Sequence, residues 1–290
     1  MLALCVSAAC VNRSPASPTD APGGDGAVRT VTSLETGDPI PFAHVTIDSK
    51  ELTADDHGRV TFDGVPARDA AVTLSAPGFL SRDTLGSAPS FSMFASRPGF
   101  DADFLKQIVY NGGTVNYHPA AKAYVRLASE LRGTPAEDAM RAAVAQVNGD
   151  LGEAAFELTD APPSGAIVYD VRVDPTIASG GLTYLALSGS RVTSGTIRFA
   201  SMAMAAFVPL ATHELGHAAG LNGHDPGPGL MTAVIPAGIT DFTPSEKLAL
   251  KIRTRPSGVT YVDNDRVALY AQAAVSGEGG ASITIRCGAR

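Results

Sequence analysis

The sequence has few of the residues that build several common kinds of site. It contains three cysteines among 290 residues, Cys5, Cys10 and Cys287, so neither a disulfide framework nor a cysteine-ligated metal site is expected. Acidic residues outnumber basic ones by 29 to 22, and the basic residues form no stripe, so nucleic acid is not expected as a partner. The sequence also has no internal repeat and no Gly/Asp nonapeptide repeat of the calcium-binding kind.

Long apolar runs are absent too. The run Met202–Ala211 covers about ten residues ahead of Glu214 and predicts a buried helix, because a bilayer span needs about 20. The first ten residues, MLALCVSAAC, are also too short to span a bilayer. Within them, Ser7-Ala8-Ala9-Cys10 resembles a bacterial lipobox, with Ser7 where that motif prefers Leu, and the resemblance implies a lipid on Cys10 and attachment to the cell envelope. A cleaved signal on a secreted protein and a frayed cytosolic N-terminus are the alternatives.

The composition that remains indicates packed domains. Apolar residues make up 44% and charged residues 18%, so the chain as a whole is not disordered. A length of 290 residues allows one large domain, or a catalytic domain with a small module. Residues 11–26 (VNRSPASPTDAPGGDG) have almost no apolar content and predict a disordered tether after the signal-like segment 1–10.

Residues 27–93 predict a small all-β sandwich. Short strand-like segments at 42–47, 59–62 and 71–76 are separated by turn residues. The stretches TGDPIPFAHV (36–45), DHGRVTF (56–62) and APGF (76–79) resemble the carboxypeptidase-regulatory-like sandwich module. The resemblance implies a spacer or docking module without chemistry of its own.

Residues 100–265 mix helix and strand and predict an α+β catalytic domain, followed by a C-terminal extension over 266–290. Strands are expected at 122–128, 166–173 and 196–200, and helices at 134–147, 209–219 and 244–253. Thr134, Pro135 and Glu137 predict an N-cap, a first helical residue and a capping box for the first of these helices. Thr243 is the expected cap of the last one.

Three of the six histidines fall within the segment HELGHAAGLNGH (213–224). Helical positions four apart share a face, so His213 and His217 can point to one place, while Glu214 lies about 100° round the helix, within reach of a water on the metal. Gly220 permits a left-handed helix end, and His224 follows it by four residues, which allows a three-histidine site. Three protein ligands leave one tetrahedral position open, as catalytic zinc requires.

This segment resembles HExxHxxGxxH, the signature of the metzincin clan of zinc endopeptidases. The resemblance implies a Met-turn that packs beneath the metal, for which Met231 is the candidate, and a structural Asp225 similar to the adamalysin pattern. Ala233 stands where astacin-like and serralysin-like members carry Tyr, so no Tyr ligand is expected. The strand at 196–200 and the helix that follows Phe242 are similar to a matrixin-like bacterial branch.

The predicted activity is therefore zinc-dependent hydrolysis of peptide bonds in a peptide or protein substrate. Glu214 would accept a proton from the attacking water and pass it to the leaving amine. The resemblance implies an edge strand within Gly181–Ser188 that pairs with an extended substrate. Two alternatives stay open: a non-catalytic zinc-binding or adhesion protein of the envelope, and a zinc amidase that acts on cell-wall peptides. The intact Glu214 favours an enzyme over a metal-binding module.

Overall fold

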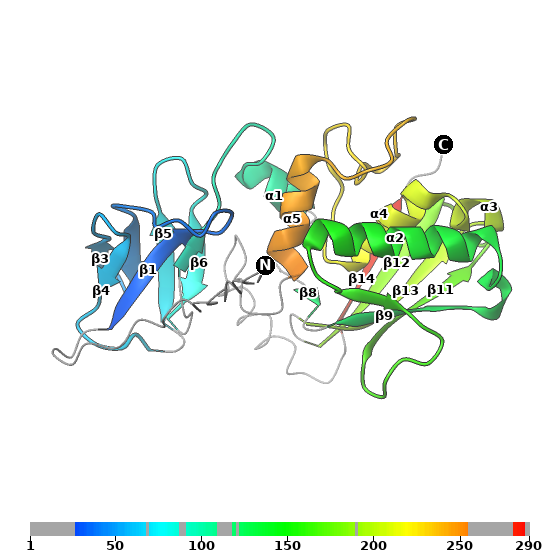
Figure 1. The fold of residues 1–290 in the computed structure, drawn as a ribbon, viewed down its shortest axis with the longest axis horizontal. Coiled ribbons are helices and arrows are strands. Elements are labelled where there is room, and N and C mark those ends of the chain that lie inside the picture. Colours follow the sequence, from blue (N-terminus) through cyan, green and yellow to red (C-terminus); the bar gives the residue numbers. More distant parts are fainter. Residues whose placement is uncertain are drawn as a thin grey trace, which may run out of the picture.

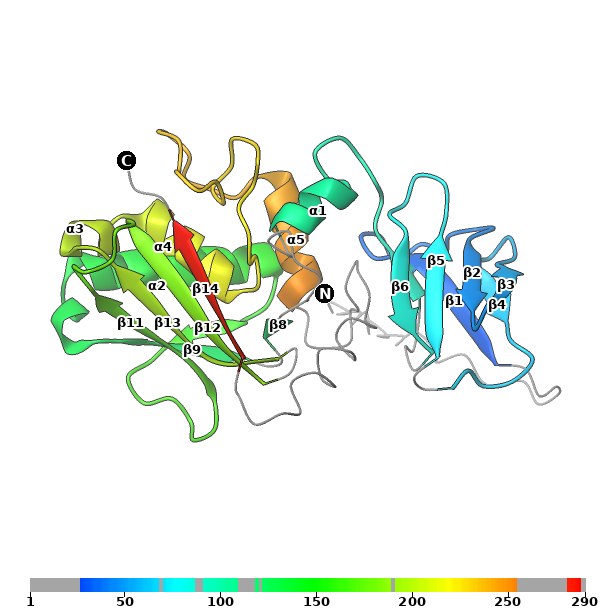
Figure 2. The ribbon, with the colours of Figure 1, turned by 180° about the vertical axis from the view of Figure 1, so that it is seen from behind.

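A computed structural model of the chain describes residues 27–67, 70–86, 91–108, 118–119, 122–188, 191–254 and 281–287. Within these residues the fold is a mixed α/β arrangement with three sheets and five α-helices, which agrees with the predicted α+β class (Figures 1 and 2). Each helix in this described part is too short or too polar to cross a bilayer. The predicted signal segment 1–10 and tether 11–26 lie outside the described residues.

Two small sheets form an N-terminal unit, at the left of Figure 1. One has the order β4-β1-β7 and the other the order β3-β2-β5-β6. Their strands are β1 (Val28–Ser33), β2 (His44–Ile47), β3 (Lys50–Thr53), β4 (Arg59–Thr61), β5 (Ala71–Ser75), β6 (Arg82–Leu85) and β7 (Phe91–Met93). Val31 and Phe91 of the first sheet share one buried core with Val45, Val72 and Leu74 of the second. The three strands predicted here are present as β2, β4 and β5.

A seven-stranded sheet organises the larger unit, in the order β10-β9-β11-β13-β12-β14, with β8 paired to β13. Its strands are β8 (His118–Pro119), β9 (Ala123–Leu127), β10 (Phe156–Leu158), β11 (Ile167–Val173), β12 (Gly181–Ser188), β13 (Arg191–Phe199) and β14 (Ala281–Cys287). β9, β10, β11 and β13 are parallel, whereas β12 is antiparallel to both β13 and β14. Residues 281–287, expected in an extension beyond the domain, therefore pair with the domain's own sheet.

The helical elements are α1 (Ala102–Ile108), η1 (Ser129–Leu131, a 3-10 turn), α2 (Pro135–Leu151), α3 (Met202–Ala205), α4 (Val208–Ala218) and α5 (Pro244–Thr254). Helices α2, α3 and α4 pack against this sheet, whereas α1 packs against α5 on the side of the N-terminal unit (Figure 1). The predicted cap of α2 is present, since Thr134 Oγ1 accepts the Ala136 N–H at 3.2 Å. Glu137 closes the box one residue earlier than expected, on the Gly133 N–H at 2.8 Å. α2 packs along α4, which the large sheet supports from below in Figure 1.

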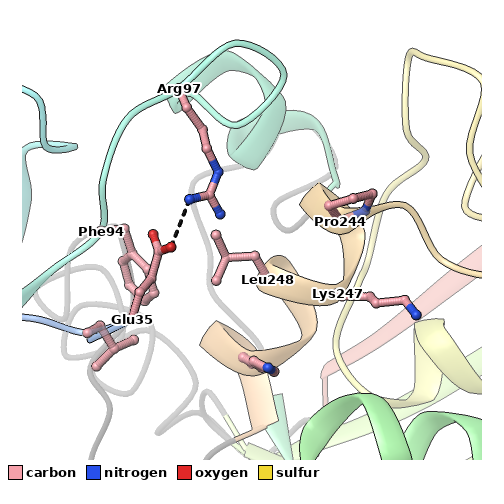
Figure 3. A pocket seen from close by; sticks show the side chains of 8 residues that line it. Glu35, Phe94, Arg97, Pro244, Lys247 and Leu248 are labelled. Carbon is pink, nitrogen blue, oxygen red and sulfur yellow. Dashed lines mark hydrogen bonds and ion pairs between the residues drawn. The ribbon is translucent and has the colours of Figure 1, made fainter. Parts of the chain in front are cut away.

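The two units meet at α5 and at the segment that follows β7. Phe94 and Phe100 of this segment pack into the core of the larger unit, and Arg97 forms an ion pair with Glu35 at 2.7 Å. A pocket of about 330 Å³ lies at this junction (Figure 3). It is lined by Leu34, Glu35, Phe94, Arg97, Pro244, Lys247, Leu248 and Lys251.

Candidate metal centre

Three histidines lie together on α4 and in the loop after it: His213, His217 and His224, which we call the histidine centre. His213 and His217 are fully buried, and His224 is partly buried. One ring nitrogen of each residue lies within 4.8 Å of the other two, and the Nε2 atoms of His213 and His217 are 3.0 Å apart. The predicted convergence is therefore present, and the three side chains could hold a metal ion.

The chain reverses directly after α4. Gly220 has a φ of 108°, which a side chain would strain. Its N–H donates to the His217 carbonyl at 3.0 Å, and the Leu221 N–H donates to the Gly216 carbonyl at 3.1 Å. These two bonds form the Schellman ending that satisfies the last carbonyls of a helix. The reversal predicted from Gly220 is thus observed.

The loop that carries His224 is one residue longer than the metzincin signature. HExxHxxGxxH places the third histidine three residues after the glycine, whereas His224 follows Gly220 by four. The segment therefore departs from the signature by one inserted residue between Gly220 and His224. Two backbone bonds hold the longer loop: the Gly223 N–H donates to the Ile108 carbonyl, and the Asp225 N–H donates to the Met231 carbonyl, both at 2.8 Å.

Backbone carbonyls fix the orientation and tautomer of the two buried rings. His213 Nδ1 lies 2.6 Å from the Leu230 carbonyl oxygen, and His217 Nδ1 is hydrogen-bonded to the Leu221 carbonyl oxygen. A carbonyl can only accept, so each Nδ1 carries the proton and donates it. In the neutral ring, each Nε2 then presents a lone pair, which is the form that binds metal.

Burial keeps these imidazoles neutral. Desolvation lowers the pKa of His213 from 6.5 to about 4 and that of His217 well below 6.5. It also lowers the pKa of His224. The neighbouring rings add to the effect at His213 and His217, because a second positive charge nearby is unfavourable. At neutral pH the centre therefore offers three uncharged nitrogen donors.

This donor set fits a divalent cation. Two neutral rings that each donate through Nδ1 direct two Nε2 lone pairs toward one region, where a positive charge is favourable. Zinc–nitrogen bonds of about 2.0–2.1 Å in a tetrahedron separate two ligand nitrogens by roughly 3.3 Å. The observed 3.0 Å between the Nε2 atoms of His213 and His217 is close to that value.

Glu214 is buried on the same helix, and its carboxylate lies against β12. Thr183 Oγ1 donates to Glu214 Oε2 at 2.6 Å and lies 3.1 Å from the Glu214 carbonyl oxygen. A Cβ atom built on Gly181 would come within 2.1 Å of Glu214 Oε1. The glycine therefore leaves the space that this carboxylate occupies, and Thr183 fixes its position.

Met231 lies beneath the helix that carries the first two histidines. It is fully buried, and a Cβ atom built on Gly216 would meet its Sδ at 2.7 Å. Gly216 directly precedes His217, so Met231 packs against the turn of α4 that carries this histidine. Asp225 lies in the nearby turn, where its Oδ1 accepts the Gly227 N–H at 2.7 Å.

Glu246 of α5 holds the Leu230–Met231 turn in place. Its carboxylate accepts the N–H groups of Met231 at 2.6 Å and Leu230 at 3.2 Å, and also that of its own cap residue Thr243 at 2.7 Å. Burial raises the pKa of Glu246, and the nearby Asp225 raises it further. The Leu230 carbonyl in turn accepts from His213, so Glu246 acts on the histidine centre through one peptide unit.

Sequence reasoning missed four residues around this centre: Gly181, Thr183, Glu246 and Tyr169. The Tyr169 hydroxyl donates to the Ala218 carbonyl at 2.8 Å and anchors the end of α4 to β11. Glu246 had a signal, because Thr243-Pro-Ser-Glu246 is a capping-box sequence. The other three had none, since their roles depend on how β11 and β12 pack against α4.

The other histidines lie apart from this centre. His44 is exposed on β2, His57 is exposed in a turn, and His118 begins β8. Comparison with known proteins adds no relative: no family model matches the sequence, and no curated protein matches it.

Proposed function

We propose that the chain is a zinc-dependent endopeptidase of the metzincin kind, with the histidine centre as its metal site and Glu214 as its general base. One observation carries this proposal. Backbone carbonyls hold His213 and His217 in the tautomer that presents Nε2, and the two Nε2 atoms lie 3.0 Å apart on the helix that also carries a buried carboxylate.

Zinc suits this set of ligands better than magnesium or calcium does. Neutral imidazoles are good ligands for zinc, whereas magnesium and calcium prefer oxygen. His213, His217 and His224 would hold the ion and leave one position open. When bound there, zinc would polarise the scissile carbonyl and lower the pKa of a bound water to about 7.

The chain's own residues would then carry the proton transfers. Glu214 would accept a proton from the attacking water and give it to the leaving amine. Thr183 supports this role because its hydroxyl holds Oε2, and Gly181 supports it because it leaves room for Oε1. Met231 and Glu246 would position the ligands without binding the metal.

The N-terminal unit is proposed to be a carboxypeptidase-regulatory-like sandwich that acts as a spacer or docking module. Two small sheets that share one apolar core support this assignment. Lipid attachment at Cys10, and a place in the cell envelope or outside the cell, stay predictions from the sequence. A module beyond a tether would suit a peptidase held at a membrane surface.

Glu214→Gln tests the function directly. We expect the variant to bind zinc like the unmodified protein and to lose peptide cleavage, because an amide cannot accept the proton of the attacking water. Glu130→Gln on the exposed η1 turn is the matched control and should keep full activity. Zinc content and cleavage of a quenched-fluorescence peptide library report the two properties. Full activity of Glu214→Gln would remove Glu214 from the reaction.

The same assay separates the two alternative functions. A zinc-loaded protein that cleaves neither peptides nor cell-wall fragments would be a binding or adhesion protein. Turnover of cell-wall fragments without cleavage of proteins would indicate a zinc amidase instead, with the same roles for the histidine centre and Glu214.

A further inference from the structure

The strand that positions Glu214 also has a second neighbour. β12 contacts Glu214 through Gly181 and Thr183. It pairs with β13 along one edge and with β14 along the other. The register places Gly181 opposite Cys287 and Thr183 opposite Ile285. β14 therefore runs past the same residues that hold the proposed general base (Figure 2).

This pairing corrects one expectation. β12 was predicted to be an edge strand open to an extended peptide, but β14 covers that edge from Gly181 to Leu187, with Gly181 opposite Cys287 and Leu187 opposite Ala281. β14 itself is the last strand of the sheet and pairs with β12 alone among the described strands. Its removal would leave the pairing of β12 with β13 in place.

A strand added to a sheet edge binds mainly through its backbone. Any extended peptide can make the same main-chain bonds, so β14 and an external peptide would compete for β12. β14 and an external peptide cannot occupy the β12 edge together, because each edge of a strand can form a hydrogen-bond ladder with only one partner strand.

We propose that β14 is a self-ligand on the β12 edge, which excludes extended peptides from the strand beside Glu214 until it is displaced. The expected effect of β14 on peptide cleavage rests on the proposed function. The expected effect of β14 on peptide binding does not, because binding at the β12 edge requires no catalysis. The ligand class it competes with is an extended peptide.

The strength of the block follows from tethering. Residues 255–280 join β14 to α5, and a segment tethered to its site within the same chain acts at an effective concentration on the order of 1 mM. If the strand alone bound with a Kd of about 0.1 mM, roughly one molecule in ten would have an open edge, and peptide binding would be weakened about tenfold. Deletion of residues 281–290 should remove this factor.

Peptide binding tests the inference without relying on chemistry. The probe is a fluorescein-labelled peptide with the sequence of residues 281–286, ASITIR, and a scrambled peptide is its control. Binding is measured by anisotropy in chains that carry Glu214→Gln, with and without residues 281–290. We expect about tenfold tighter binding to the truncated chain, and about tenfold faster peptide cleavage when the same truncation is made with Glu214 intact.

Two proline variants of the full chain guard against misfolding of the truncated form. Successive N–H groups of a strand point to opposite sides, so only one of Ile283→Pro and Thr284→Pro removes an N–H that faces β12. That variant should bind the probe more tightly, and the other is its matched control.

Equal probe binding by the full chain, the truncated chain and both proline variants would overturn the inference, whether or not any form cleaves peptides. A difference in binding without cleavage by any form would support the self-ligand and remove the proposed function. If the full and truncated chains cleave peptides equally well and bind the probe equally well, the proposed function is supported and the self-ligand inference is refuted.

Discussion

Gly181→Ala should separate the position of Glu214 from the binding of metal. The added Cβ would lie 2.1 Å from Oε1, 2.7 Å from Cδ and 2.9 Å from Cγ of Glu214. Ordinary contact begins at 3.4 Å, so the carboxylate must move by about 1.3 Å, the difference between 3.4 and 2.1 Å. A misplacement of about 1 Å at a reacting group can cost about 100-fold in rate. We therefore expect kcat/KM to fall by about 100-fold.

Zinc content shows whether the fall in kcat/KM comes from a displaced Glu214 carboxylate or from lost metal. The three atoms nearest the added Cβ all belong to Glu214, which is not a proposed ligand, so Gly181→Ala should keep its zinc. Gly149→Ala on α2 is the matched control, because nothing lies within 4 Å of its added Cβ, and it should keep full activity. Unchanged kcat/KM in Gly181→Ala, measured on a quenched-fluorescence peptide, would refute the assigned position of Glu214.

Three further predictions concern the support of the centre. Gly216→Ala would place a Cβ 2.7 Å from Met231 Sδ, and overpacking of this kind should lower the free energy of unfolding by about 1–3 kcal/mol and weaken zinc binding, as thermal unfolding and zinc titration would measure. Glu246→Ala would leave the buried N–H groups of Leu230 and Met231 without their acceptor and should lower the free energy of unfolding by about 3 kcal/mol in denaturant titration, whereas a change near zero would argue against this role. Acidification from pH 6.5 to about 4 should lower the free energy of unfolding of the metal-free protein by about 3 kcal/mol through His213 alone. The reason is that in this range the unfolded chain binds a proton at His213 and the folded chain does not. A free energy of unfolding that rises as the pH falls through this range would contradict the prediction.

The local parts of the site could be predicted from the sequence. The spacing of His213 and His217 fixes their common face as soon as the segment is helical, and Gly220 marks the end of that helix. The cap of α2 at Thr134 followed from the same kind of short-range rule. These features depend on residues within about one or two turns of each other.

The remaining features depend on contacts between distant segments. Thr183 reaches Glu214 only because β12 packs against α4, and no pattern in the sequence indicates that pairing. The role of β14 depends on its register with β12, which joins residues about a hundred positions apart. The capping-box sequence of Glu246 predicts its bond to Thr243 but not its bonds to Leu230 and Met231. The additional residue before His224 is tolerated because the carbonyl of Ile108 holds Gly223.

Metal content of the purified protein tests the central claim most directly. The protein and its His217→Ala variant are loaded with zinc, dialysed and analysed, with His44→Ala on the exposed β2 position as the control. We expect about one zinc per chain in the protein and in the control, almost none in His217→Ala, and loss of peptide cleavage on addition of a chelator. Stoichiometric zinc in His217→Ala, or a protein that takes up no zinc at all, would contradict the proposed metal site.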